Sequence, residues 1–164
     1  MGLRDFLERV VGGAGGSGSD SAGDTGGRTR SRRRSRRRSR RQPKLGQAPQ
    51  HAVDIAARTL QVSTAEGMVI VVLDQEAAAA LQETLARDES AALHGPAGAG
   101  KPAGEVVYFV PTWRAALAVH DPRYGWAVPV DGEERVGIAK LGTAPQEVEV
   151  SARLGLVIEE TPRP

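Results

Sequence analysis

The feature that most limits how this chain can fold is an arginine run from Arg28 to Arg41, in which ten of fourteen residues are arginine. So many like charges cannot be packed into a core, and residues 12–27 before them are rich in glycine and serine. We therefore expect a flexible linker at residues 12–27 and a disordered basic arm at residues 28–49. A globular domain is then confined to residues 50–160.

Charge is divided unevenly between these parts. Residues 1–44 carry 13 Lys and Arg against 4 Asp and Glu, whereas residues 45–164 carry 9 against 16. The balances of +9 and −7 together give the net charge of +2 for the 164 residues. A basic tail on an acidic domain predicts that the tail binds a polyanion.

The arginine run is expected to contact nucleic-acid phosphates, because a guanidinium group pairs with phosphate oxygens in a fixed fork geometry. No Phe, Tyr or Trp lies in residues 7–107, so the arm has no side chain on which a base could stack. The contact should therefore be non-specific and weakened by salt. The alternative is that the tail folds back onto the acidic domain. The predicted contact residues are Arg28, Arg30, Arg32, Arg33, Arg34, Arg36, Arg37, Arg38, Arg40 and Arg41.

Three serines interrupt the arginine run at regular intervals. Ser31, Ser35 and Ser39 each follow an arginine by three residues, so they are candidate phosphorylation sites. Phosphates there would each remove about 1.5 to 2 positive charges. We favour the simpler interpretation, in which serine only interrupts a low-complexity sequence.

Residues 1–11 predict a short amphipathic helix. Its apolar stripe follows helical spacing and consists of Leu3, Phe6, Leu7, Val10 and Val11. A helix of this length is not stable alone in water, so we expect it to fold only when it docks on a protein partner or a membrane surface.

The domain is expected to have an α+β fold, with a small mixed sheet and two or three helices. Gly67–Leu73 is a continuous apolar run that predicts a strand buried on both faces, and Asp74 is expected to cap a helix through Arg87. A second strand is expected at residues 105–110. Alternating apolar residues at 148–158 predict one half-buried strand, bent at Gly155.

The remaining segments have weaker patterns in the sequence. Residues 51–61 fit either a helix or a strand, residues 88–104 suggest a loop, and Thr112 is expected to cap a short helix. Residues 126–130 and 135–140 are expected to flank a hairpin loop at 131–134.

Five of the six aromatic residues lie within residues 108–126. We expect Tyr108, Phe109 and Trp113 to anchor the core. Tyr124 and Trp126 are expected to be exposed, where they could contact a partner or stack on bases.

No catalytic, metal-binding or cofactor-binding residues are predicted. The chain contains no cysteine, and His51, His94 and His120 are scattered. The sequence from Gly95 to Lys101 (GPAGAGK) matches a phosphate-binding loop, but Pro102 occupies the Ser/Thr position and neither a strand before it nor a helix after it is expected. We interpret it as an ordinary loop.

These features predict a non-enzymatic, cytoplasmic protein whose arm binds nucleic acid or another polyanion while the domain assembles with itself or a protein partner. In layout, the chain resembles nucleoid-associated proteins and small viral capsid proteins, which implies association with a nucleoid or particle. The alternative is a peripheral membrane scaffold, held by the helix at residues 1–11 and the polybasic run. That layout resembles bacterial division-site membrane tethers.

Overall fold

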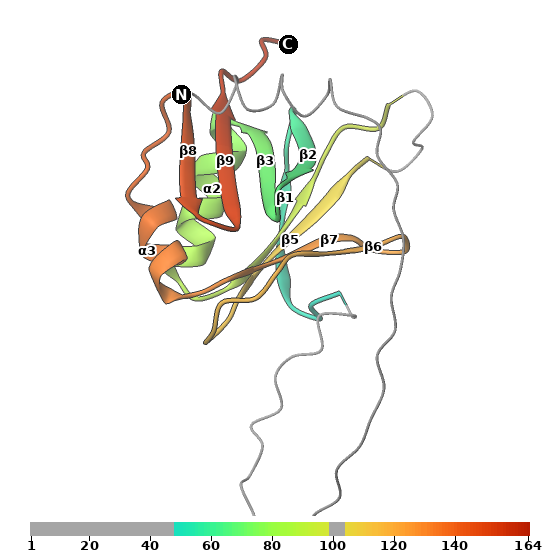
Figure 1. Cartoon of the computed structure of the whole chain (residues 1–164). Helices are drawn as coiled ribbons and strands as arrows, with labels where there is room; N and C mark the ends of the chain where they lie inside the picture. The colour runs from blue at the N-terminus through green and yellow to red at the C-terminus, as the bar shows by residue number, and fades with distance from the viewer. Residues whose placement is uncertain (1–47, 99–103) are drawn as a thin grey trace, which may run out of the picture.

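The computed structural model describes residues 48–98 and 104–164 (Figure 1). Within these residues it contains two helices and nine strands in two mixed sheets. The predicted α+β class is thus confirmed, although the strands form two sheets where one was expected. The predicted helix at residues 1–11, the linker and most of the arm lie outside the described residues.

Two sheets share the strands. The five-stranded sheet has the order β1-β4-β5-β7-β6, and the four-stranded sheet has the order β2-β3-β9-β8. Their elements are β1 (Ala52–Ala56), β2 (Leu60–Ala65), β3 (Met68–Asp74), α2 (Gln75–Ala86), β4 (Ser90–His94), β5 (Val106–Pro111), β6 (Val119–Asp121), β7 (Gly125–Val130), α3 (Gly132–Ala139), β8 (Gln146–Ser151) and β9 (Leu154–Glu159).

The main core lies between the two sheets and around α2. In Figure 1 the four-stranded sheet lies in front of α2, and α2 also contacts β1 and β4 of the five-stranded sheet. Alternate residues of β3 (Val69, Val71 and Leu73) point to this side, as expected for a pleated strand. Leu81 and Leu85 of α2 are buried against them. One helix therefore connects the two sheets.

The strand at Gly67–Leu73, the helix that follows it and the strand at 105–110 are confirmed as β3, α2 and β5. Residues 51–61 are extended, with β1 and the start of β2, so the strand alternative is correct there.

Four other expectations were wrong. Residues 90–94, expected in a loop, form β4, which is sandwiched between β1 and β5. Residues 135–140 were expected as a strand, but α3 begins at Gly132 and includes most of them. The segment after Thr112 is not helical. The single strand at 148–158 is instead the β8–β9 hairpin, which turns before Gly155.

Candidate interaction surfaces

The residues predicted to bind nucleic acid, to dock on a partner or to be phosphorylated all lie outside the described residues. They are the ten arginines of Arg28–Arg41, the apolar stripe Leu3, Phe6, Leu7, Val10 and Val11, and the serines Ser31, Ser35 and Ser39. The structure therefore describes the folded domain that carries the arm, and the surfaces of this domain are the candidates for binding.

Asp74 is a buried carboxylate at the end of β3, 1 % exposed. Its Oδ2 accepts the backbone N–H groups of Arg58 (2.7 Å) and Thr59 (3.1 Å), and its Oδ1 accepts that of Ala77 (3.1 Å). Burial acts to raise the pKa of Asp74, but these backbone hydrogen bonds outweigh it and hold the pKa below its ordinary value. Asp74 therefore caps α2, as the sequence predicted, and also fixes the turn before β2.

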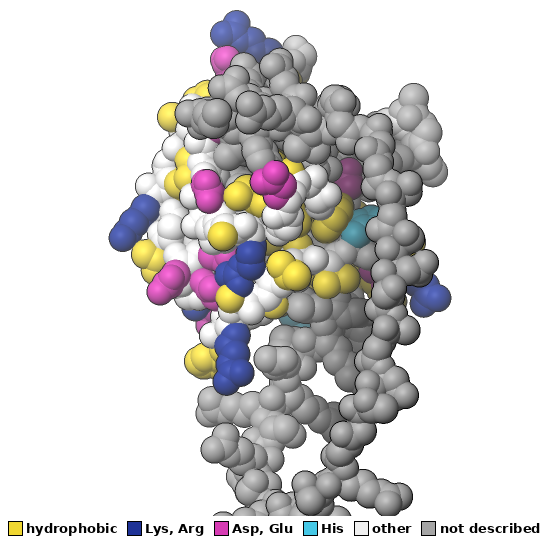
Figure 2. Space-filling model, viewed as in Figure 1, with side chains coloured by type: hydrophobic (Ala, Val, Ile, Leu, Met, Phe, Trp, Pro, Cys, Tyr) yellow, Lys and Arg dark blue, Asp and Glu magenta, His cyan; other side chains and the backbone are white. Residues whose placement is uncertain are grey.

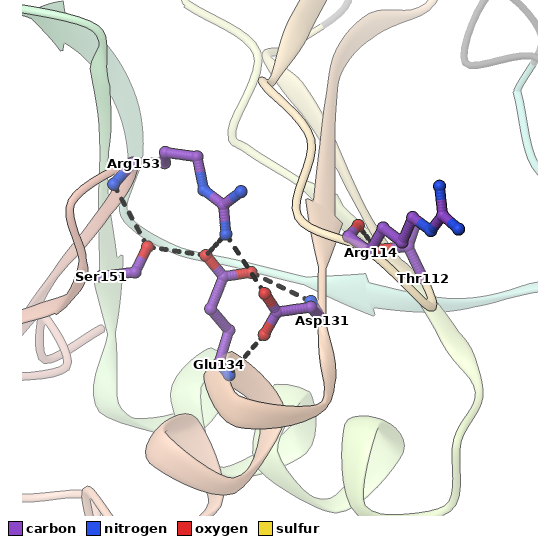
Figure 3. Close-up of polar contacts among 6 residues, drawn as sticks. All are labelled: Thr112, Arg114, Asp131, Glu134, Ser151 and Arg153. Atoms are coloured by element: carbon purple, nitrogen blue, oxygen red, sulfur yellow. Dashed lines mark hydrogen bonds and ion pairs between the residues drawn. The ribbon is translucent and has the colours of Figure 1, made fainter.

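A second polar cluster joins the start of α3 to the β8–β9 turn (Figure 3). The Arg153 guanidinium donates to Asp131 Oδ2 (3.2 Å) and Glu134 Oε1 (2.9 Å). Ser151 Oγ donates to the same Glu134 oxygen (2.6 Å). Asp131 and Glu134 each accept the other's backbone N–H at 2.9 Å, which forms a capping box. The cluster holds one cation between two carboxylates.

The charges in this cluster stabilise one another. The backbone N–H of Glu134 and the Arg153 guanidinium hold the pKa of Asp131 below its ordinary value, although burial opposes them. Burial acts to lower the pKa of Arg153, but Glu134 and Asp131 outweigh it and raise that pKa. Every polar side chain here has a partner within the cluster, so the arrangement is explained as a structural link between α3 and the hairpin. Sequence reasoning missed it, although Asp131 and Glu134 have the spacing of a capping box.

The aromatic residues do not form one patch. Phe109 is fully buried and Tyr108 is half-buried, while Tyr124 is 37 % exposed. Trp126 was expected to be exposed, but it is half-buried against the core and its ring centroid lies 5.0 Å from that of His120. Trp113, expected in the core, is 92 % exposed.

Residues 112–118, which we call the Trp113 loop, form the first candidate surface. Thr112 N–H donates to Val130 O (2.8 Å), and Thr112 Oγ1 donates to Arg114 O (2.9 Å), which fixes the start of the loop beside the end of β7. Trp113 and Leu117 (64 % exposed) project into solvent. In Figure 3 the Arg114 side chain points away from the Arg153 cluster. Tyr124 precedes Gly125, the first residue of β7, whereas the start of the loop lies beside Val130, the last residue of that strand.

The second candidate surface is the side of the four-stranded sheet turned away from α2, which we call the outer face. It carries a small apolar cluster that is separate from the main core. Its members are Ala65, Met68, Ile70, Val72 and Val157. Figure 2 views the domain from this side and shows hydrophobic and acidic side chains together on its described part.

Four of the eight basic residues of the described domain lie beside acidic side chains. Arg58, Arg87 and Arg135 form ion pairs with Glu76, with Glu83 and Glu89, and with Asp88. Arg153 lies in the cluster described above. The described residues carry 8 Lys and Arg against 16 Asp and Glu, a balance of −8.

The histidines remain separate in space. His94 Nε2 lies 2.8 Å from Asp54 Oδ1, on the neighbouring strand β1, and both side chains are exposed. His120 contacts Trp126, and His51 lies in the turn before β1. Within residues 48–98 and 104–164, no group of three or more His, Cys, Asp or Glu side chains is placed to hold a metal ion.

The match to a phosphate-binding loop is not supported by its surroundings. Contrary to expectation, a buried strand, β4, does end directly before Gly95. The chain then returns as β5, which pairs antiparallel with β4, and Gly95 N–H donates to Glu105 O at 2.8 Å. A phosphate-binding loop instead leads from a strand into a helix.

Comparison with known proteins gave no relative: no protein-family model matches the chain, and no curated protein matches it either. Neither helix of the described residues has the length and apolar character needed to cross a membrane.

Proposed function

We propose that this chain is a binding and assembly protein, in which the arginine run contacts nucleic-acid phosphates and the folded domain contacts protein. The observation that carries this proposal is the separation of charge. Ten arginines lie within fourteen residues, attached to a domain whose described residues have a balance of −8. A polyanion is attracted to the run and repelled by the domain, so binding is expected to be local to Arg28–Arg41.

Ion pairing of arginines in the domain supports phosphate binding by the arginine run and not by the domain. Arg58, Arg87, Arg135 and Arg153 already lie beside carboxylates. Phosphate binding by these guanidinium groups would have to displace those carboxylates. The arginine run, in contrast, has only four acidic residues in the 44 residues that contain it.

The Trp113 loop supports a role in assembly. An indole that is 92 % exposed, on the same loop as a leucine that is 64 % exposed, leaves apolar area in water, and Trp and Arg are enriched at the centres of protein interfaces. Trp113, Arg114 and Leu117 supply this combination on one short loop. We propose that this loop contacts the protein partner, which in self-assembly is a second copy of the chain.

The arm is tested by two deletions of equal length. Removing residues 28–41 deletes fourteen residues and ten positive charges, whereas removing residues 12–25 deletes fourteen residues of linker. Fluorescence anisotropy with labelled single- and double-stranded oligonucleotides, over a salt series, measures binding. We expect the linker deletion to bind as the full chain does, with a log–log salt slope of up to about −9 on double-stranded DNA if all ten arginines contact phosphate. The arm deletion should not bind.

Two results of these binding experiments would contradict the proposal. Undiminished, salt-insensitive binding by the arm deletion would overturn the proposal. Binding of the full chain to vesicles of anionic phospholipid but not to oligonucleotides would support the membrane scaffold in its place.

Assembly is tested separately by substitution in the Trp113 loop. Trp113→Ala should lower the molar mass measured by light scattering, whereas the matched change Val136→Ala on α3 should not. An unchanged mass for Trp113→Ala would exclude the loop as the contact.

A further inference from the structure

The outer face of the four-stranded sheet is apolar along β3, where a solvent-facing strand would carry polar side chains. In register, Ile70 of β3 lies between Ser63 of β2 and Gly155 of β9, and Val72 lies between Gln61 and Val157. Ile70 is 0 % exposed. Its neighbours on β2 and β9 in the same row are a serine and a glycine, which offer little apolar contact of their own.

The described elements pack on the opposite face of this sheet. Val69, Val71 and Leu73 of β3 contact the main core with α2, and α3 contacts α2 and β8. Among residues 48–98 and 104–164, no helix or second sheet lies over the outer face (Figure 1). An apolar sheet face is stable in water when a further layer covers it. The covering layer of the outer face must therefore come from outside the described residues.

The same chain contains a segment that requires such a surface. Residues 1–11 have an apolar stripe of five residues at helical spacing and are too short to be helical alone. A sheet face of small and branched side chains, such as Ala65, Ile70 and Val157, matches a stripe that includes Phe6 and Leu7 in size and chemistry. Each would bury the apolar surface of the other.

The connection is long enough to allow this contact. Residues 12–47 provide 36 residues between the segment and the first described residue, Ala48. A Gly/Ser-rich chain of that length has a root-mean-square span of about 30–36 Å, and repulsion among the ten arginines extends it further; the radius of gyration of a domain of this size is about 13 Å. The segment can therefore reach any face of its own domain. The tether raises its effective concentration there to the millimolar range, which favours the same chain over a second copy.

Charge on this side of the domain also fits the segment. Glu147 and Glu149 of β8 pair with Val157 and Gly155, on the outer face, and a groove of ≈ 470 Å³ beside them is lined by Glu147, Val157, Glu159 and Glu160. The segment carries Arg4 and Arg9 at the two edges of its stripe, and Asp5 and Glu8 between them on the polar side. An acidic rim around an apolar surface is complementary to an apolar stripe flanked by arginines.

We propose that residues 1–11 form an amphipathic helix that docks, within the same chain, on the outer face of the four-stranded sheet. This proposal does not depend on what the arginine run binds. While the helix is docked, its apolar stripe is unavailable to a membrane or a protein groove. The linker and arm are then attached to the domain at both ends, as a loop.

Cross-linking tests the docking directly, because the chain contains no cysteine of its own. Phe6→Cys is combined with Ser63→Cys on the outer face, and the control combines Phe6→Cys with Val136→Cys, on the exposed side of α3. A short bismaleimide is added to dilute full-length protein, and the products are separated on a denaturing gel. Docking predicts that the first pair gives an intrachain product at least about ten-fold faster than the control pair. Equal rates for both pairs would overturn the proposal, and so would products that are mainly dimers, since these indicate a second copy as the occupant.

A second measurement leaves the folded domain unchanged. The chain has four isoleucines, Ile55, Ile70, Ile138 and Ile158, whose δ-methyl groups can be labelled and resolved by NMR. Phe6→Asp places a charge on the apolar stripe, and Glu8→Gln changes the polar side of the same segment. Docking predicts that Phe6→Asp shifts the Ile70 methyl signal and leaves Ile138, in the main core, in place. Glu8→Gln should shift neither. An Ile70 signal that is identical in the full chain and in Phe6→Asp would contradict the docking.

Discussion

At the level of single residues, two buried carboxylates fix the ends of elements that lie far apart in sequence. Asp74 accepts three backbone N–H groups and joins the turn before β2 to the start of α2. Glu134 accepts from Arg153 and Ser151 and joins α3 to the β8–β9 turn. Charged acceptors make stronger hydrogen bonds than neutral ones, so each carboxylate holds a contact between elements as well as a helix end.

Asp74→Ala should destabilise the domain substantially at neutral pH. The change removes a helix cap, worth about 0.5–2 kcal/mol, and leaves buried N–H groups without an acceptor, which costs about 1–3 kcal/mol. We expect a loss of about 2–4 kcal/mol in the free energy of unfolding, measured by urea titration. Glu76→Ala, at the exposed second residue of the same helix, is the matched control. It loses a helix-dipole contact and a surface ion pair with Arg58, and should change the value by less than about 1 kcal/mol.

The effect of Asp74 should also depend on pH. Its pKa is lower in the folded state than the value of about 3.9 in the unfolded chain, so its ionised form stabilises the fold above that value. The stability is lost as pH falls through the folded-state pKa. The difference between the wild type and Asp74→Ala should therefore be constant from about pH 5 to 7 and shrink below about pH 4. A difference that stays the same at pH 3 would show that the charge of Asp74 does not contribute.

At the level of elements, the sequence predicted those with a strong local signal. The β-branched run at β3 and the alanine-rich helix after Asp74 both carry such signals. β4 does not, because its sequence SAALH lacks the branched and aromatic residues that favour strands. It is a strand because β1 and β5 pair with it on either side. Pairing between distant segments cannot be read from local composition.

Two errors had a signal in the sequence that was misread. Asp131 and Glu134 have capping-box spacing, which should have favoured a helix at α3 over a hairpin. In the β8–β9 hairpin, before the register shift between Glu149 and Ser151, even-numbered residues pair with even-numbered residues, for example Val148 with Leu156. The alternation of apolar residues therefore continues through the turn at 152–153, and the two strands resemble one long strand in the sequence.

The β6–β7 turn depends on one glycine. Gly125 has a φ of +96°, and a Cβ atom there would lie 2.2 Å from Val106 O. Gly125→Ala should therefore disturb both the turn and the pairing of β7 with β5, with a loss of more than about 2 kcal/mol. Gly132→Ala, at the first residue of α3, meets nothing within 4 Å and should be neutral or stabilising by up to about 1 kcal/mol. Urea titrations of both variants measure the effect. Similar stability for the two would mean that the turn tolerates a side chain.

At the scale of the whole molecule, the sequence separated the basic arm from an acidic α+β domain but did not predict the surfaces of that domain. Trp113 was assigned to the core because a large apolar side chain is usually buried. Its exposure follows from the path of the chain between β5 and β6: β7 lies between these strands in the sheet, and the connection passes the end of β7 without regular structure. The outer face of the four-stranded sheet was also unexpected, because β3 is apolar on both sides and only the sheet order shows which side meets α2.

The two sheets should unfold together, because α2 packs against strands of both. Leu81, near the middle of α2, is 1 % exposed within the main core that includes residues of each sheet. Leu81→Ala should cost about 2–5 kcal/mol, since it leaves a cavity where the sheets meet. The loss should appear equally in both sheets, for example at Val71 in the four-stranded sheet and Val128 in the five-stranded sheet, when amide hydrogen exchange is followed by NMR. Val136→Ala, at an exposed position of α3, should leave exchange in both sheets unchanged. If Leu81→Ala accelerated exchange in only one sheet, the sheets would be separate cooperative units, and α2 would belong to that sheet alone.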